Sequence, residues 1–434
     1  MNRGVYSLAL RALSPLVWLW MGHRARRAGG QWEIFSAERF GHAAPVVAAD
    51  AIAAAWTAPV WVHAVSLGET RAAQPLLQAL LDRGLPVLLT HMTATGRAEG
   101  ARQYAEAIAR GQLRQAWLPY DFPGATRRFM AAWRPRCGLL IEREIWPNLL
   151  AAARGAGVPM ALVSARFSAS SLRQAGRMGG VMREALGGLD SVLAQTAEDA
   201  DRLVQAGAPQ PVVTGNLKFD LVLPAAQVAA GQAWRERLGR RVVAVASTRE
   251  GEDSGFIEAI KRHAAMPGAP LFLLIPRHPQ RFDEAARLLS EAGLPYVRRS
   301  EGLEPGSQTA VLLGDTLGEM AFHYAASDVA IVAGSFAPLG GQNLIEACAA
   351  GVPVIVGPHT FNFKQAAEDA VAAGAALRAA DAGQAVDAAM ALLADEPRRQ
   401  RAAEAALAWF RMHSGATGRT LDALEPWLGA GKAG

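Results

Sequence analysis

Residues Arg241-Val242-Val243-Ala244-Val245-Ala246 and Leu271-Phe272-Leu273-Leu274-Ile275 are two β-rich apolar runs with a helix-like segment between them. A strand, a helix and a second strand predict a right-handed βαβ unit with parallel strands. The same alternation extends in both directions along the chain. The other strand candidates are Val60–Ala64, Pro86–His91, Leu139–Ile141, Met160–Val163, Val192–Ala194, Val212–Thr214, Ala310–Leu313, Val329–Val332 and Val352–Val356. The sequence therefore predicts an α/β fold with two doubly wound, Rossmann-like parallel sheets in tandem.

The length of 434 residues suits two domains of about 200 residues each. We predict a helix over residues 1–27, a first domain over 28–223, a helical connector over 224–239, and a second domain over 240–434 that includes the terminal helices. A cleft between the two domains is where we expect the chemistry.

The net charge of +5 comes from lysines and arginines that are scattered along the chain. This distribution argues against a nucleic-acid-binding protein and favours an acidic small molecule or an anionic membrane as partner. The two cysteines, Cys137 and Cys348, lie far apart in apolar surroundings. We interpret them as free, buried thiols in a reducing compartment.

The amino terminus is almost continuously apolar from Gly4 to Gly22 and then runs into His23, Arg24, Arg26 and Arg27. It lacks the small-residue cleavage site of a signal peptide. On a helix, Arg3, Ser7, Arg11 and Ser14 fall in one polar arc, with Trp18 and Met21 as apolar exceptions in that arc. This pattern favours a helix lying in a membrane interface, with the arginines keeping the protein on the cytoplasmic side. The alternative is an apolar helix folded onto the first domain.

Three polar segments follow strands in the first half, where loops and helix amino termini bind ligands in parallel sheets. The first places Glu69 at the opening of a helix, where it serves either as a site carboxylate or as a favourable charge on the helix dipole. The second ends a strand with Glu142-Arg143-Glu144, and the alternative there is a surface ion pair. The third carries Lys218 near the domain junction, although most lysines are simply solvated.

The second half repeats this arrangement with basic, acidic and glycine-rich loops. Pro276-Arg277 ends a strand, and the Arg is placed to bind a phosphate. Gly314 to Glu319 is a second polar loop, and plain loops are the alternative for both. In the segment Gly340-Gly341-Gln342-Asn343-Leu344-Ile345-Glu346, a glycine turn exposes backbone N–H groups to a phosphate and Glu346 can accept ribose hydroxyls. These features indicate a nucleotide site.

Several other chemistries are excluded by motif. The chain has no P-loop, no dinucleotide-binding Gly-x-Gly-x-x-Gly, and no nucleophile elbow around Ser66. Asp199 and Asp201 would point apart on a helix, and the nine histidines lack metal-ligand spacing. We therefore predict no metal and no cofactor.

Taken in order, the motifs resemble the bacterial Kdo (3-deoxy-D-manno-octulosonic acid) transferases. The resemblance covers nearly the whole chain and rests on Glu38–Gly41, His63–Glu69, Leu118–Asp121, Glu142–Asn148, Gly215–Asp220, Pro276–Pro279, Gly314–Glu319, Gly340–Glu346 and Gly357–Phe363. It implies the GT-B architecture, a CMP-Kdo donor, and a lipid A precursor (lipid IVA) as acceptor in lipopolysaccharide inner-core synthesis. It also implies a location on the cytoplasmic face of the inner membrane and an inverting, metal-independent transfer.

The resemblance also assigns roles to individual residues. It implies that Glu69 is the proton acceptor and that Glu142 and Lys218 stabilise the transition state. The implied CMP contacts are Pro276, Arg277, Leu317, Gly318, Glu319, Asn343, Leu344, Ile345 and Glu346. Gln342 departs from the family pattern, because many relatives carry His after the paired glycines.

Two other functions remain open on the sequence. One is a transferase or epimerase of the same architecture that uses a UDP-sugar, which the second-half motifs would allow. The other is a catalytically silent membrane scaffold, for which Glu69, Lys218 and Arg277 would be surplus.

Overall fold

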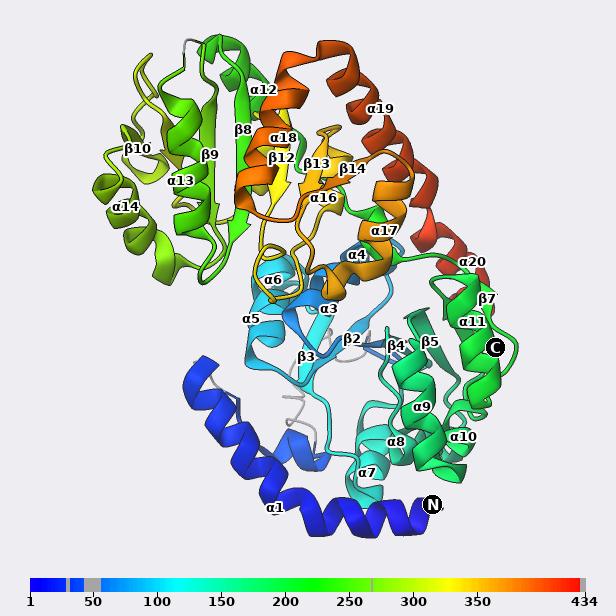
Figure 1. Ribbon diagram of the computed structural model, residues 1–434. Helices are drawn as coiled ribbons and strands as arrows, with labels where there is room; N and C mark the ends of the chain where they lie inside the picture. The colour runs from blue at the N-terminus through cyan, green and yellow to red at the C-terminus, as the bar shows by residue number, and fades with distance from the viewer. Residues whose placement is uncertain (29–31, 43–55, 267, 430–434) are drawn as a thin grey trace. The chain divides into compact units, whose positions relative to one another are not determined.

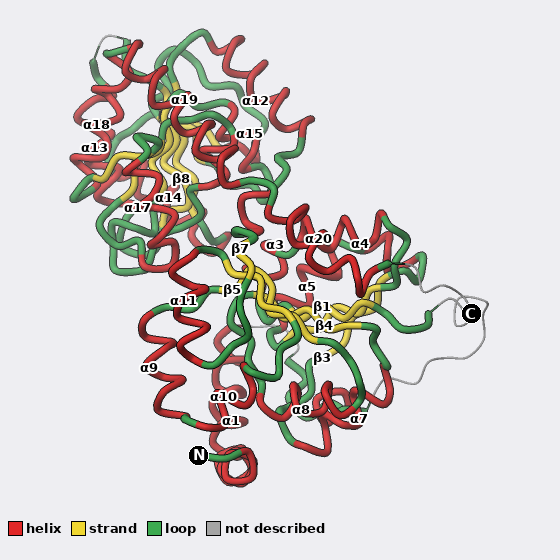
Figure 2. The backbone as a smooth tube through the Cα atoms, turned by 90° about the vertical axis from the view of Figure 1, so that its right-hand side faces the viewer, coloured by secondary structure: helices red, strands yellow, loops and turns green. Residues whose placement is uncertain are grey.

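The computed structural model describes residues 1–28, 32–42, 56–266 and 268–429. The chain divides into two compact units, the first formed by Met1–Leu221 with Ser414–Gly434 and the second by Val222–His413. Each unit contains one seven-stranded sheet in which all neighbouring strands are parallel, and Figures 1 and 2 show helices on both faces of each sheet. The predicted fold class, two doubly wound sheets of the GT-B type, is confirmed.

The first sheet has the strand order β3-β2-β1-β4-β5-β6-β7. Its central strands are buried along their full length, so they are mostly apolar rather than alternating, with polar residues such as His63, Thr90 and His91 near their carboxyl ends. The strands are β1 (Val60–His63), β2 (Val87–His91), β3 (Leu113–Trp117), β4 (Cys137–Ile141), β5 (Met160–Ala165), β6 (Ser191–Ala194) and β7 (Val212–Val213). The helices are α1 (Arg3–Ala28), α3 (Leu67–Ala72), α4 (Gln74–Asp82), α5 (Ala94–Gln103), α6 (Ala105–Ala109), α7 (Pro123–Trp133), α8 (Pro147–Gly155), α9 (Ala169–Met178), α10 (Gly180–Leu186), α11 (Ala197–Ala206) and α20 (Ala416–Leu428), with short helices η1 (Ala37–Phe40) and η2 (Leu217–Asp220).

The second sheet has the order β10-β11-β9-β8-β12-β13-β14. Its strands are β8 (Val242–Thr248), β9 (Leu271–Pro276), β10 (Tyr296–Arg298), β11 (Val311–Leu313), β12 (Val329–Val332), β13 (Val354–Val356) and β14 (Ala376–Arg378). The helices are α12 (Ala225–Leu238), α13 (Asp253–Ala264), α14 (Phe282–Glu291), α15 (Met320–Ala325), α16 (Ile345–Ala349), α17 (Lys364–Ala372), α18 (Ala382–Ala394) and α19 (Glu396–His413), with η3 (Pro279–Arg281), η4 (Arg299–Glu301) and η5 (Phe361–Phe363).

The strands that the sequence pattern missed are β3, β10 and β14, and each lies at an edge of its sheet. Edge strands are covered on fewer sides, so they need no continuous apolar run. In β3, for example, Arg114 and Gln115 are only half-buried. The alternation of apolar strands therefore identified the sheet interiors but not these borders.

Two predicted boundaries are corrected by the packing. Helix α12, predicted as a connector, belongs to the second unit, where Trp234 packs on Phe322 and its indole donates to Glu304. Helix α20 belongs to the first unit rather than the second, because Leu421 and Leu424 lie in the first unit's core. The spacing of residues along the chain cannot show that the last helix packs back on the first unit.

Helix α1 packs on the first unit through Tyr6 and part of its polar arc, including Ser7 and Ser14, and its apolar face is exposed. Tyr6 donates to Asp121 at 2.9 Å, and Ser7 donates to Asn148 at 3.1 Å. Trp18, the apolar exception in that arc, sits among aromatic rings that include Phe40 and Tyr120. On the other face, Leu8 and Leu19 are 69% and 72% exposed. Figure 1 shows that α1 bends along its length, and Pro15 lies inside it.

Candidate active site

In the first unit, Glu69 and Glu142 follow the two strands at which the sheet order reverses. The chain passes from β1 to β2 on one side, whereas β4 lies on the other side of β1. Ligands of open parallel sheets bind at such a point, beyond the carboxyl ends of the strands. The topology therefore brings together two carboxylates that are more than 70 residues apart in sequence.

Glu69 lies in the first turn of α3, and Gly68, which was predicted to form a tight turn before the helix, lies inside the helix instead. Its Oε2 accepts the backbone N–H of Val65 at 2.5 Å, which fixes the carboxyl group beside its own loop. Burial, followed by the nearby charges of Glu144 and Glu142, raises the pKa of Glu69 to about 8. A carboxyl group with a raised pKa is a stronger base once it is ionised, as a general base near neutral pH requires.

Glu142 and Lys218 form an ion pair at the same edge of the sheet. Lys218 Nζ lies 2.5 Å from Glu142 Oε1, and both side chains are largely buried. Glu142 adopts a φ of +64°, a region that costs a residue other than glycine on the order of 1–3 kcal/mol. Lys218 is held by η2, where Asn216 accepts its backbone N–H. The structure thus brings all three predicted catalytic residues to one edge of one sheet.

Glu144 is a further member of this carboxylate group, beyond the three residues assigned as catalytic. It was recognised as part of the Glu142–Asn148 motif, but the sequence offered no reason to separate it from a surface ion pair. In the structure, its Oε2 accepts the indole N–H of Trp146 at 2.8 Å and lies 3.8 Å from His63 Nε2. Burial is the main cause that raises the pKa of Glu144 to about 7.

In the second unit, the sheet order reverses between β8 and β12. Buried Glu252, which follows β8, accepts four backbone N–H groups: Arg249 at 2.8 Å, Gly334 at 2.7 Å, Phe336 at 2.9 Å and Ala337 at 3.2 Å. It therefore joins the loops that follow both strands at the reversal. Sequence reasoning missed Glu252, because no local motif marks a carboxylate with three of its four partners more than 80 residues away.

Arg277 follows Pro276, the last residue of β9. Its backbone N–H donates to Thr248 at 2.9 Å, and its side-chain Nε donates to Gln342 Oε1 at 3.2 Å. Gln342, the departure from the family pattern, therefore contacts the predicted phosphate-binding arginine. A Gln carbonyl at this position orients the guanidinium without removing its charge.

The paired glycines form the tight turn that the sequence predicts. Gly340 and Gly341 have φ of +93° and +79°, and a Cβ on Gly340 would lie 2.4 Å from Asn362 Nδ2. No other residue fits there without moving Asn362. The turn therefore joins two segments of the family pattern, Gly340–Glu346 and Gly357–Phe363.

Past this turn, the predicted CMP contacts divide into half-buried polar side chains and buried apolar ones. Asn343 donates to Glu346 Oε1 at 3.0 Å and accepts the Ile345 N–H at 3.1 Å. The side chains of Leu344 and Ile345 are buried in the core, so only their backbones can contact a ligand.

The third group of predicted CMP contacts precedes α15. Leu317 is exposed, and Gly318 has a φ of +83°. Glu319 pairs with Arg299 at 2.9 Å, and this pairing lowers its pKa. Glu319 is therefore ionised at neutral pH, and its negative charge is balanced by the positive charge of Arg299.

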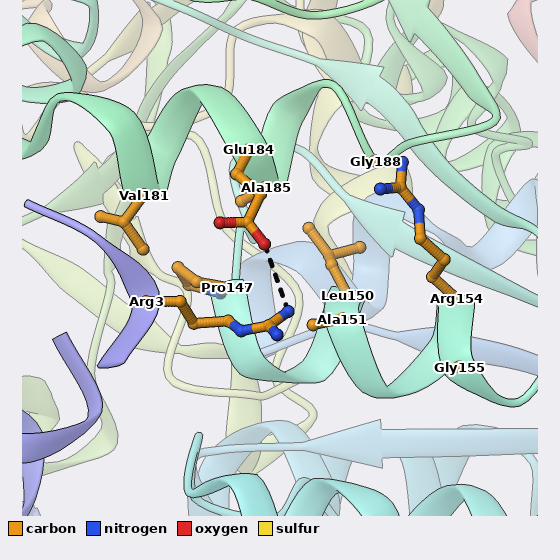
Figure 3. A pocket seen from close by; sticks show the side chains of 10 residues that line it. All are labelled: Arg3, Pro147, Leu150, Ala151, Arg154, Gly155, Val181, Glu184, Ala185 and Gly188. Carbon is orange, nitrogen blue, oxygen red and sulfur yellow. Dashed lines mark ion pairs between the residues drawn. The ribbon is translucent and has the colours of Figure 1, made fainter. Parts of the chain in front are cut away.

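A cavity of about 330 Å³ lies elsewhere in the first unit, between α1, α8 and α10. Figure 3 shows Arg3 and Glu184 pointing toward each other across it, with their ion pair at 3.3 Å. None of the predicted site residues lines this cavity. Within the described ranges, no three His, Cys, Asp or Glu side chains are placed to hold one metal ion.

Comparison with known proteins identifies the family. Residues 36–221 match the family described as 3-deoxy-D-manno-octulosonic-acid transferase (kdotransferase), and residues 295–409 match the group 1 glycosyl transferases. A 3-deoxy-D-manno-octulosonic acid transferase of Bordetella pertussis is 70% identical over 99% of this chain and 100% of its own. The chain belongs to the Kdo transferase family.

This result confirms the resemblance stated above and makes the protein a glycosyltransferase. A second Kdo transferase, from Haemophilus influenzae, is 31% identical over 85% of this chain and 87% of its own. Among solved structures, a UDP-GlcNAc 2-epimerase from Neisseria meningitidis bound to UDP-GlcNAc covers 85% of this chain and all of its own, with a TM-score of 0.57 at 14% identity. That likeness shows the fold alone. The residue roles predicted for this Kdo transferase remain predictions.

Proposed function

We propose that this Kdo transferase moves Kdo from CMP-Kdo to a lipid A precursor, lipid IVA, in lipopolysaccharide inner-core synthesis, by an inverting displacement that uses no metal. The observation that carries the proposal is the group of Glu69, Glu142 and Lys218 at the strand-order reversal of the first sheet. The direct test is mass spectrometry of the product formed from CMP-Kdo and lipid IVA by the purified enzyme, with and without a chelator. A product without added Kdo would overturn it.

In this reaction, Glu69 is the general base. An acceptor hydroxyl attacks the anomeric carbon of Kdo, a new C–O bond forms, and the bond to the CMP phosphate breaks. The hydroxyl proton passes to Glu69, because an alcohol is a poor nucleophile at neutral pH. The Val65 N–H orients the carboxylate for this step.

Glu142 and Lys218 stabilise the charges that develop in the transition state. The anomeric carbon becomes positive while the leaving phosphate becomes negative. Lys218 supplies a cation for the anion, and Glu142 supplies an anion for the sugar ring or for the hydroxyl network. Their 2.5 Å pairing keeps both side chains in place before substrate binds.

In the second unit, two predicted contacts would bind the CMP part of the donor. Arg277 binds the phosphate of CMP, and Glu346 accepts hydrogen bonds from the ribose hydroxyls. The support is the position of Arg277 directly after β9, and of Glu346 in the first turn of α16 beside the paired-glycine turn.

We expect Arg277→Ala to weaken CMP binding by about tenfold or more. A charge-assisted hydrogen bond to phosphate contributes roughly 1.5–3 kcal/mol, and each 1.4 kcal/mol is a factor of about ten. Titration calorimetry with CMP measures the change, and Arg287→Ala, an exposed arginine on α14, is the matched control. An Arg277→Ala protein with unchanged CMP affinity would place the phosphate elsewhere. Tighter binding of UDP than CMP by the unmodified protein would favour a UDP-sugar donor.

We further propose that α1 holds the enzyme on the cytoplasmic face of the inner membrane. Its support is the exposed apolar face of the helix. By length and composition, Arg3–Arg26 is the one helical stretch of the described residues that could cross a membrane. Only 11% of its most apolar 18 residues are buried. Because the polar arc contacts the first unit, the apolar face remains available for lipid.

The triple variant Leu8→Gln, Leu16→Gln and Leu19→Gln is expected to lower vesicle affinity by about 100-fold or more. Each leucine contributes on the order of 1.5–3 kcal/mol when it leaves water. Sedimentation with phosphatidylglycerol-containing vesicles measures the effect. The matched control replaces three exposed apolar residues of the second unit, Val222, Leu303 and Met412, by Gln. Equal losses in both variants would remove α1 as the membrane contact.

A further inference from the structure

Fully buried His63 and largely buried Glu144 form a pair that the mechanism above does not use. Glu144 lies two residues after Glu142, in the loop that follows β4, and its side chain is 17% exposed. His63 is the last residue of β1 and is fully buried. The Nε2 of His63 has no hydrogen-bond partner among the described residues, and Glu144 Oε2 lies 3.8 Å from it.

The hydrogen-bond network assigns the tautomer of His63. Its Nδ1 lies 3.1 Å from the carbonyl oxygen of Thr90 and 2.9 Å from the Thr90 hydroxyl. A carbonyl oxygen can only accept, so the hydrogen lies on Nδ1 and donates to Thr90. Burial, together with smaller contributions from the neighbouring His91 and Arg39, lowers the pKa of His63 to about 3. His63 is therefore neutral, and its Nε2 is a hydrogen-bond acceptor.

An acceptor nitrogen beside a carboxyl group favours the protonated form of that group. An ionised Glu144 would place two acceptors opposite each other, whereas a protonated Glu144 donates to Nε2 after a small rotation. Both carboxyl groups accept an N–H that favours the charged form, from Val65 on Glu69 and from Trp146 on Glu144. The acceptor nitrogen of His63 is therefore the contact that distinguishes Glu144. We propose that Glu144 is a positioning residue that carries a proton directed at His63, so that Glu69 is the ionised member of the pair. This inference rests on the proposed role of Glu69.

The charged groups around Glu144 are consistent with a shared proton. Glu69 and Glu142 face it with like charge, and Arg143 is the nearby cation. Lys218 is already paired with Glu142. Neighbouring buried carboxyl groups do not ionise together easily, so they titrate as a pair. Burial and neighbouring charges raise the pKa of Glu69 to about 8 and that of Glu144 to about 7, so these two causes alone would ionise Glu144 first. The acceptor nitrogen of His63 reverses this order, so the first proton leaves Glu69 and the second leaves Glu144 at higher pH.

The pH profile of kcat tests the pair in the full chain. We expect an acid limb from Glu69 and an alkaline limb from ionisation of Glu144. Glu144→Ala is expected to lower kcat by about tenfold, because it removes the carboxyl group that contacts Trp146 and His63 and so positions the loop after β4. Glu144→Gln is expected to recover most of that loss, since its amide donates to His63, and to abolish the alkaline limb while the acid limb stays. Glu198→Gln, an exposed carboxylate on α11, is the control and keeps both limbs.

Infrared spectroscopy tests the protonation state without activity. At neutral pH, the carbonyl stretch of a protonated carboxylic acid is expected in the unmodified enzyme, in Glu69→Gln and in Glu198→Gln, and its Glu144 contribution is lost in Glu144→Gln. An unchanged band in Glu144→Gln, together with an acid limb moved to lower pH, means that Glu144 is ionised and overturns the inference. Full activity of Glu69→Gln with the Glu144 band present would instead overturn the proposed base.

Discussion

Glu69→Gln is expected to lower kcat by on the order of 10²–10⁴ while CMP still binds and the fold survives. The amide keeps the size of the side chain but cannot take a proton from the acceptor hydroxyl. In the unmodified enzyme, kcat should rise with pH through the pKa of Glu69, because only the ionised form is a base. That limb lies above the ordinary glutamate range, since burial and the neighbouring carboxylates raise the pKa of Glu69.

The measurement is turnover with CMP-Kdo and lipid IVA across pH, together with CMP titration calorimetry. Glu198→Gln is the matched control, because it removes an exposed carboxylate from the same unit. A Glu69→Gln enzyme that keeps most of its kcat would remove Glu69 from the mechanism. Loss of CMP binding in the same variant would point to unfolding rather than chemistry.

Glu252→Ala is expected to destabilise the second unit by about 3–5 kcal/mol. The substitution leaves four backbone N–H groups without the carboxylate that accepts them. Hydrogen bonds to a charged group contribute more than neutral ones, and buried donors without a partner are costly. The loops after β8 and β12 should therefore loosen together, and CMP affinity should fall with them.

Urea unfolding and hydrogen exchange of residues 334–337 measure this effect. Glu258→Ala, an exposed carboxylate on α13, is the control and should change neither quantity. Glu252→Gln retains the shape and part of the accepting capacity, so an intermediate loss is expected. If exchange at 334–337 is unchanged in Glu252→Ala, the carboxylate does not hold these loops.

The donor and acceptor motifs were visible in the sequence because each is local. Gly340-Gly341, for example, must be glycine because the turn has positive φ at both positions and Asn362 leaves no room for a side chain. Arg277 is marked by its place directly after an apolar strand. A residue whose role is set by its own turn or strand end is predictable from spacing alone.

Helix α1 marks a limit of sequence periodicity. The pattern separated a polar arc from an apolar remainder, but either face could have contacted the first unit. The structure places this side of the helix against the protein: Ser7 donates to Asn148, Met21 is buried and Trp18 is half-buried among aromatic rings. Trp18 and Met21, the apolar exceptions in the polar arc, are thus the side chains that pack α1 on the first unit.

The sequence by itself determined the fold class, the family and the residues of the two motif sets, because apolar alternation and strand-end motifs depend on neighbours along the chain. Only the tertiary structure decided that α20 returns to the first unit, that Glu144 lies beside His63, and that Glu252 joins two loops. Those contacts link residues 80 or more positions apart. They depend on strand order, and in a parallel sheet the strand order is set by how the helices pack rather than by any local pattern.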